Sequence, residues 1–249
     1  MGIISKSERE ITLMRQAGKI VAIVLDILRT KVQPGIKTKE LDEIAVKELK
    51  RLGGKSSFKG YRGYPASLCV SINDEIVHGI PGSKILREGD IVSLDFGAIY
   101  NGYHGDAAIT VGVGKITPAA GKLIEATEGA LKEGIKAARD GSRLGDVSNA
   151  IQRFAEKTGF AVVRQYTGHG IGREMHEEPL IPNFGTPKTG PLLKKGMTFA
   201  IEPMLNIGTW ETKVDDDEWT VRTLDGSLSA HFENTIAITE GEAEVLTTL

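Results

Sequence analysis

Apolar residues recur every three or four positions in four segments of the chain, which is the spacing that gathers them on one face of a helix. Each segment also begins or ends at residues typical of helix termini. The first follows Ser7 and Glu10, whose spacing predicts a capping box. The predicted helices begin after Ser7, at Thr38, at Thr117 with Pro118, and near Val147, and the second and fourth end at the glycines Gly53 and Gly159.

Between the predicted helices the apolar period changes to two, which predicts β-strands. Four of these segments each contain one carboxylate, and they are "GDIVSLDFGAI" with Asp95, "GDAAITV" with Asp106, "GMTFAIEPML" with Glu202, and "FENTIAIT" with Glu233. In each segment the carboxylate shares its strand face with small or polar residues, while large apolar residues point to the opposite face. A single strand carboxylate usually faces water, but four in the same arrangement favour one shared, enclosed site.

The chain also shows signs of an internal duplication. Asp95 and Glu202 are 107 positions apart, and the glycine pairs Gly35/Gly141, Gly53/Gly159 and Gly89/Gly196 are separated by 106 or 107 positions. The offset from Asp106 to Glu233 widens to 127, and we expect a hairpin at 208–227 to absorb the extra residues. The offsets predict a single domain over residues 1–249, built from pseudo-symmetric halves of about 1–114 and 115–249. A chance likeness of two α/β halves is the alternative.

Composition narrows the possible classes of function. The 249 residues include 31 Lys and Arg and 33 Asp and Glu, so the net charge of −2 gives no basic surface for DNA or an anionic membrane. No apolar stretch approaches the roughly 18 residues that cross a bilayer, and the start "MGIISKSERE" has no signal-peptide core. The single cysteine, Cys69, excludes an intrachain disulfide and fits a reducing compartment. We expect a cytoplasmic protein without DNA or membrane partners.

The four strand carboxylates have a chemical explanation if the two halves pack about a pseudo-two-fold axis. An unpaired buried carboxylate costs several kcal/mol or takes up a proton, and four together also repel one another. A pair of divalent cations removes both penalties. The small neighbours then leave a hollow for ions, water and a substrate.

The stretch "TGHGIGREMHEEP" places His169 and His176 seven positions apart in a glycine-rich segment, which we expect to be a loop. It is not the G-x-G-x-x-G turn of a dinucleotide-binding fold, because the Pro- and Gly-rich residues that follow cannot form the required helix. It is not a zincin motif either, because no histidine stands four residues after His176. Next to four carboxylates, His169 is interpreted as the imidazole that completes a two-metal centre.

These residues resemble one known family. The order Asp95, Asp106, His169, Glu202, Glu233, within "VHGIP", "HGDAA", "TGHGIG", "IEPM" and "FENT", is similar to that of the bacterial, type I methionine aminopeptidases of metallopeptidase family M24. The resemblance covers nearly the whole chain. It implies an α+β "pita-bread" fold, in which a pseudo-two-fold antiparallel β-sheet is backed by helices and two metals lie in the central cleft.

The resemblance also implies the activity and the metal ligands. The activity is removal of the initiator methionine from nascent polypeptides with a small second residue, by hydrolysis with metal-activated water. Asp95 chelates one of two divalent cations (Co, Mn, Fe or Zn), Asp106 and Glu233 bridge both, and His169 and Glu202 complete the other. Glu202 is also the family's proposed general base. The partners implied are nascent N-termini, with the ribosome as a candidate meeting place, and the chain is expected to be a monomer.

The remaining implied roles concern the substrate. His176 matches the residue that donates to the substrate carbonyl, and His78 matches the one near the scissile nitrogen; neither is expected to bind metal. The implied methionine pocket is lined by Phe58, Tyr61, Tyr64, Cys69, Met175 and Trp219. Many bacterial relatives have Cys where Phe58 stands and Phe where Met175 stands, which leaves fine specificity open. His104 and His231 either support the ligands or are only structural.

Two other functions compete with this interpretation. A proline-directed peptidase resembling aminopeptidase P or prolidase shares the fold but usually carries a large N-terminal domain, for which the first helix at Ser7 leaves no room. A metal-free binding module of the same fold is expected to lose ligands, whereas this chain keeps all five.

Overall fold

The computed structural model describes residues 2–249, and its helices match the four predicted from apolar spacing. The Ser7 backbone N–H donates to Glu10 Oε2 at 2.9 Å and the Glu10 N–H donates to Ser7 Oγ at 3.4 Å, so the predicted capping box is confirmed. Thr117 caps the third helix, and Gly159 ends the fourth in the left-handed conformation. The helices are α1 (Glu8–Lys31), α2 (Thr38–Arg51), α3 (Pro118–Ala137) and α4 (Leu144–Thr158), with a 3₁₀ turn at Tyr61–Gly63.

The strands form one large antiparallel sheet and two small ones. The large sheet contains β1 (Lys55–Ser56), β4 (Ile91–Tyr100), β5 (Tyr103–Gly112), β14 (Glu233–Ala237), β9 (Thr198–Ile201), β7 (Gly168–Gly170) and β8 (Glu177–Ile181) in that spatial order, with β2 (Leu68–Ile72) on β4 and β15 (Glu244–Val245) on β14. The small sheets have the orders β13 (Ser229–His231), β10 (Met204–Asn206), β6 (Ala161–Val162), and β11 (Thr212–Val214), β12 (Val221–Thr223), β3 (Glu75–Val77). The hairpin expected at 208–227 is β11–β12.

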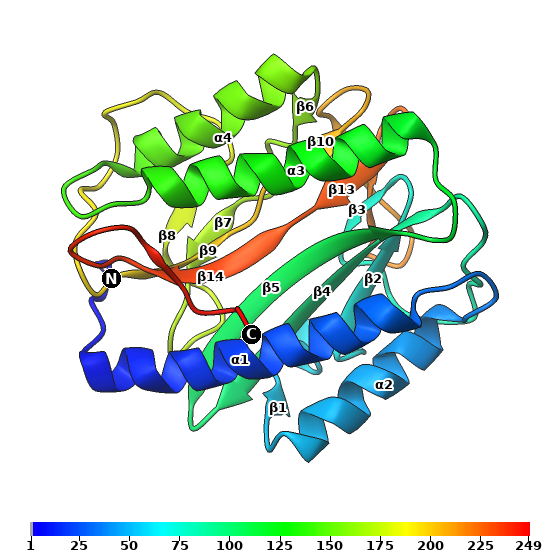
Figure 1. The fold of residues 1–249 in the computed structure, drawn as a ribbon, viewed down its shortest axis with the longest axis horizontal. Coiled ribbons are helices and arrows are strands. Elements are labelled where there is room, and N and C mark those ends of the chain that lie inside the picture. The colour runs from blue at the N-terminus through cyan, green and yellow to red at the C-terminus, as the bar shows by residue number, and fades with distance from the viewer. Residues whose placement is uncertain (1) are drawn as a thin grey trace.

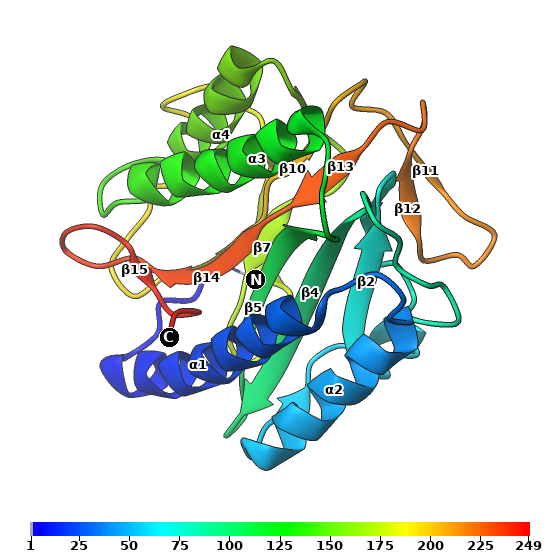
Figure 2. The ribbon, with the colours of Figure 1, turned by 45° about the vertical axis from the view of Figure 1, so that its right-hand side comes forward.

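The helices pack as two pairs, and the sheet runs between them (Figures 1 and 2). In Figure 1, α1 and α2 lie below β14 and β5, and α3 and α4 lie above them. Leu94 and Phe96 of β4 are fully buried in one cluster with Val21 and Leu25 of α1. Because side chains alternate along a strand, the helix pair covers the face of β4 opposite to Asp95. The predicted antiparallel sheet backed by helices is confirmed, and it leaves the carboxylate face free to line a cavity.

Two local expectations were wrong. Glu202 does not lie inside a strand, because the segment divides into β9 and β10 at Glu202 and Pro203, and proline has no N–H to donate to a ladder. His169 does not lie in a loop: it is the middle residue of the short strand β7, which pairs with β8 and β9. The glycines on either side of His169 allow close strand approach, since a Cβ on Gly168 would lie 2.4 Å from the Ala200 carbonyl oxygen.

Helix α1 approaches β5 closely at two glycines, which gives the first testable prediction. A Cβ on Gly105 would lie 2.8 Å from the Gly18 backbone nitrogen and 3.0 Å from the Ala17 carbonyl carbon. Backbone cannot move aside as a side chain can, so we expect Gly105→Ala to lower the free energy of unfolding by about 1–3 kcal/mol. Urea denaturation measures this change in the free energy of unfolding. Gly121→Ala in α3 is the control, because its Cβ meets nothing within 4 Å, and equal losses in both variants would contradict the packing argument.

No helix within residues 2–249 combines the length and apolar character that a membrane span requires.

Candidate metal centre and substrate cavity

Strand register brings the carboxylates of both halves together. Ala108 of β5 stands opposite Asp95 of β4 on one side and opposite Glu233 of β14 on the other. Asp106 lies two residues before Ala108 on β5, so it shares the same face of the sheet. The three carboxylates therefore surround an alanine, whose methyl group leaves space between them.

The same argument extends to the histidine. Ala200 of β9 stands opposite His169 of β7 and opposite Thr235 of β14, which is two residues after Glu233. Glu202 follows β9 two residues after Ala200, and its Oε1 lies 3.7 Å from His169 Nε2. Two alanines thus mark the centre of a ring of acidic side chains and one imidazole.

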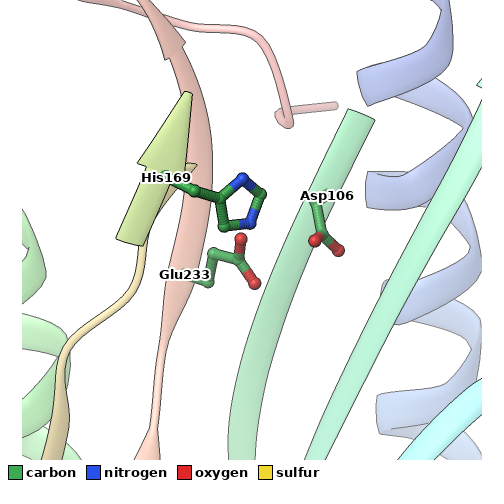
Figure 3. Close-up of side chains that lie close together, drawn as sticks. All are labelled: Asp106, His169 and Glu233. Atoms are coloured by element: carbon green, nitrogen blue, oxygen red, sulfur yellow. The ribbon is translucent and has the colours of Figure 1, made fainter. Parts of the chain in front are cut away.

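Figure 3 shows the closest members of this ring, with the Glu233 carboxylate directly below the His169 ring and Asp106 facing both from the neighbouring strand. One possible ligand atom from each of the three lies within 4.8 Å of the others, and all three residues are buried. Asp95 and Glu202 stand outside this tight group but line the same cavity, which has a volume of about 170 Å³. All the residues that the sequence assigned to the site line this cavity, and they are Phe58, Tyr61, Tyr64, Cys69, His78, Asp95, Asp106, His169, Met175, His176, Glu202, Trp219 and Glu233.

The carboxylates lack the partners that buried charges require. Asp95 Oδ1, Asp106 Oδ1 and Glu233 Oε1 are buried without a hydrogen-bond partner among the residues that the structure describes. Burial raises the pKa of Asp106 to about 7, and burial together with neighbouring carboxylates raises the pKa values of Asp95, Glu202 and Glu233 well above their ordinary range. Divalent cations supply the missing counter-charge, and oxygen-rich ligands with one imidazole suit Mn, Fe, Co or Zn. The residues fit a metal centre.

Hydrogen bonds orient the two histidines of the "TGHGIG" region. His169 Nδ1 lies 2.9 Å from the Gly170 carbonyl oxygen, which can only accept, so Nδ1 carries the proton and the Nε2 lone pair faces the carboxylates. His176 Nδ1 lies 2.9 Å from the Tyr61 hydroxyl, and the two rings stack with centroids 5.3 Å apart. Burial lowers the pKa of His169 to about 4 and that of His176 to about 3, so both are neutral at pH 7.

Aromatic side chains form the other wall of the cavity. Tyr64 meets Trp219 edge to face at 5.1 Å between centroids and Phe58 at 6.5 Å, and its hydroxyl donates to the Gly79 carbonyl at 3.0 Å. His78 meets Trp219 at 6.3 Å. The backbone of His78 is in the left-handed region, with φ 61°, which is uncommon for a residue other than glycine. The wall is apolar apart from the tips of its tyrosines and His78.

Two further residues that line the cavity, Tyr166 and Arg62, lie outside the motifs that the sequence offered. Tyr166 meets His78 edge to face at 5.8 Å, and Arg62 lies over the Tyr61 ring at 5.3 Å. His231, for which the sequence left a ligand-supporting or a purely structural role open, is buried with its Nε2 3.9 Å from Glu202 Oε2. Neither aromatic content nor strand alternation distinguishes them, although Tyr166 is three residues before His169 and adjacency to that motif was a usable signal.

Comparison with known proteins adds the family. The model of metallopeptidase family M24 matches residues 12–240. Methionine aminopeptidase 1 of Bacillus subtilis is 52% identical over 245 residues, which cover 98% of this chain and 99% of the relative. The methionine aminopeptidase of Aquifex aeolicus is 52% identical over the full length of both chains. The chain belongs to metallopeptidase family M24. Within it, the chain is of the bacterial methionine aminopeptidase type, as its sequence resemblance predicted.

Solved structures agree with this assignment. The crystal structure of methionine aminopeptidase from Thermotoga maritima has a TM-score of 0.98 and 48% sequence identity, with all of both chains covered. Prolidase from Pyrococcus furiosus has a TM-score of 0.80 at 23% identity, with 99% of this chain and 66% of that chain covered, a likeness of fold alone. The pita-bread fold is confirmed for this M24 metallopeptidase.

Burial of Asp106 in the carboxylate ring leads to a prediction for the M24 metallopeptidase after chelation. Because the pKa of Asp106 is about 7 instead of 3.8, the folded protein holds a proton that the unfolded chain releases between those values. Stability contributed by this group is therefore lost as pH rises from about 4 to about 7. We expect EDTA-treated Asp106→Asn to have a higher Tm than EDTA-treated wild type, by a margin that grows with pH in this window.

The difference between the two proteins reports Asp106 together with Asp95, Glu202 and Glu233, whose pKa values the Asp106 charge raises. Added Mn²⁺ is expected to reverse the order, since only the wild type keeps the full ligand set. Differential scanning fluorimetry from pH 4.5 to pH 7.5 measures both effects. A margin that is independent of pH would mean that Asp106 carries no buried charge.

Proposed function

We propose that this chain removes the N-terminal methionine from polypeptides with a small second residue, by metal-assisted hydrolysis of the first peptide bond. The observation that carries the proposal is one cavity in which a ring of carboxylates and His169 faces an apolar, aromatic wall. The full-length relatives named methionine aminopeptidase, at about 50% identity, support the same function.

The proposed metal ligands are Asp95, Asp106, His169, Glu202 and Glu233, and the proposed occupants are two divalent cations, with Mn, Fe, Co and Zn as candidates. The unpaired buried oxygens of Asp95, Asp106 and Glu233, together with the free Nε2 of His169 3.7 Å from Glu202 Oε1, support this set. The chemistry that such cations supply is Lewis acidity toward the scissile carbonyl and toward a hydrolytic water.

Different side chains around this centre move or hold the protons of the reaction. In the proposed mechanism Glu202 takes a proton from the attacking water and passes it to the leaving amine nitrogen, near which His78 stands. In this mechanism the Tyr61 hydroxyl, 2.9 Å from His176 Nδ1, is the donor, and the neutral imidazole then carries its proton on Nε2. His176 can then donate to the substrate carbonyl oxygen as negative charge develops there.

The methionine side chain is assigned to the aromatic wall. A thioether is polarizable and makes favourable contacts with aromatic rings, which Tyr64, Phe58 and Trp219 provide. Cys69 and Met175 are buried beside them and add two more polarizable sulfur atoms. A charged N-terminal residue would lose its hydration in this pocket without gaining a partner, which favours methionine.

The remaining parts of the proposal concern the whole protein. We assign catalysis to residues 1–249 acting as one unit, because Asp95 and Asp106 come from the first half and the other ligands from the second. The proposed substrates are the N-termini of nascent polypeptides, which the enzyme binds in the cytoplasm as the chains leave the ribosome. A monomer is sufficient, since every proposed ligand comes from one chain.

A peptide assay tests the function. Wild type loaded in separate samples with Mn, Co, Fe(II) or Zn is expected to release free methionine from Met-Ala-Ser, and mass spectrometry detects the shortened peptide. An X-Pro peptide is the matched substrate for the prolidase-like alternative, whose fold is similar. Preferential cleavage of X-Pro would establish that alternative, and absence of cleavage with all four metals, together with no bound ion, would favour the binding module.

A further inference from the structure

Lys6 is a buried cation in the extended segment before α1. Its side chain is 4% exposed, and its ammonium pairs with the Glu177 carboxylate, whose side chain is 9% exposed. Lys6 Nζ also donates to the Ile4 carbonyl at 3.2 Å. Its backbone N–H donates to the Gly196 carbonyl at 2.7 Å, just before β9. A buried ammonium is tolerated only when it is paired in this way, so the pair fixes the N-terminal segment against the sheet.

Glu177 also closes the turn that carries His176. Its Oε1 accepts from the backbone N–H groups of Arg173 at 2.9 Å and Glu174 at 3.4 Å, while its Oε2 takes the Lys6 ammonium. One carboxylate therefore joins the start of the turn, the first residue of β8 and the N-terminal segment. His176 is the residue directly before it.

The turn packs tightly against this pair at Gly172. A Cβ on Gly172 would lie 2.5 Å from both Glu177 Oε1 and Lys6 Cε. The Gly172 carbonyl accepts from the His104 N–H at 2.8 Å, and the Ile171 N–H donates to Thr198 at 3.2 Å. The base of the turn is thus anchored to the sheet, and its other end is anchored by Glu177.

We propose that Lys6 and Glu177 are positioning residues for His176: their buried ion pair holds the turn so that the imidazole faces the cavity between His169 and Tyr61. The ring centroid of His176 lies 4.1 Å from that of His169 and 5.3 Å from that of Tyr61, so a shift of the turn changes the contacts of the imidazole with both rings. The inference deepens the proposed function and rests on it where catalysis is concerned.

Two variants test the pair. Lys6→Met removes the cation and keeps a side chain of similar length, and Lys6→Met with Glu177→Gln removes both charges without leaving either buried alone. Lys195→Met is the matched control, because Lys195 pairs with Glu240 at 2.8 Å on the surface, with side chains 52% and 81% exposed. Circular dichroism and Tm identify any variant that fails to fold.

The first readout is the split between kcat and KM on Met-Ala-Ser. We expect both Lys6 variants to lose kcat by about 10- to 100-fold, part of the roughly 10²–10³ that loss of an oxyanion donor removes. KM and metal content are expected to stay close to wild type, and Lys195→Met to be unchanged. In the His176→Ala background, Lys6→Met is expected to lower kcat less than about twofold, since residues acting through one group are not additive. If the losses of kcat from Lys6→Met and His176→Ala instead multiply in the double variant, the proposal is overturned.

The second readout does not depend on activity. The His176 Cε1–H resonance, identified by its absence in His176→Ala, is expected to shift in both Lys6 variants and not in Lys195→Met. If wild type releases no methionine but the His176 resonance shifts in the Lys6 variants, the proposed function is wrong while the positioning role of Lys6 and Glu177 is supported. If wild type is active and neither kcat nor the His176 resonance changes in the Lys6 variants, the assignment of Lys6 and Glu177 as positioning residues is wrong.

Discussion

Asp106→Ala is expected to lose bound metal and activity together, by at least about 10³-fold in kcat/KM. Asp106 belongs to the group of three possible ligands within 4.8 Å of one another, and it stands beside Ala108 at the centre of the carboxylate ring. Loss of cation binding removes Lewis acidity worth several kcal/mol, and each 1.36 kcal/mol is a factor of ten in rate. Atomic emission spectrometry after gel filtration measures the metal, and methionine release measures the rate.

The control for this variant is a change outside the ring. Thr235→Val alters a side chain that exchanges hydrogen bonds only with the Asp106 backbone, at 2.8 and 2.9 Å, so it tests strand pairing without removing a ligand. It is expected to cost stability and to keep metal. An Asp106→Ala enzyme that bound two ions and kept its rate would remove Asp106 from the ligand set.

His176→Ala is expected to separate rate from metal binding. The variant should lose about 10²–10³ in kcat, because an uncharged donor to the developing oxyanion is removed, while its metal content stays at the wild-type level. The physical reason is that His176 Nδ1 is engaged with Tyr61, so Nε2 is the nitrogen left for the cavity, where the proposed mechanism uses it as a donor and not as a ligand. Steady-state kinetics on Met-Ala-Ser, with metal analysis of the same samples, measures both quantities.

Tyr61→Phe provides a graded comparison for His176. It keeps the ring that stacks at 5.3 Å and removes only the hydroxyl that lies 2.9 Å from Nδ1. We expect a smaller loss of kcat than in His176→Ala, because the imidazole remains but its tautomer is no longer fixed. Loss of metal in His176→Ala would instead make His176 a ligand.

Prediction from sequence was most successful where the controlling interactions are local. The Ser7–Glu10 capping box and the glycine that ends α4 depend on residues within one helical turn, and both were found as expected. The strand assignment of Glu202 failed because Pro203 interrupts the ladder, an effect that apolar alternation does not register. His169 was assigned to a loop because its flanking glycines resemble a turn, whereas they allow β7 to pack tightly between β8 and β9.

The sequence by itself determined the four helices, the antiparallel strands with their carboxylates and, through ordered motifs, the family. Only the tertiary structure decided that Asp95 and Glu233 meet across Ala108, and that Lys6 is buried against Glu177 beside His176. The physical reason is the range of the interactions. Helix caps and strand alternation are set by neighbours a few residues apart, whereas strand register and the burial of a charge depend on which distant segments the whole core brings together.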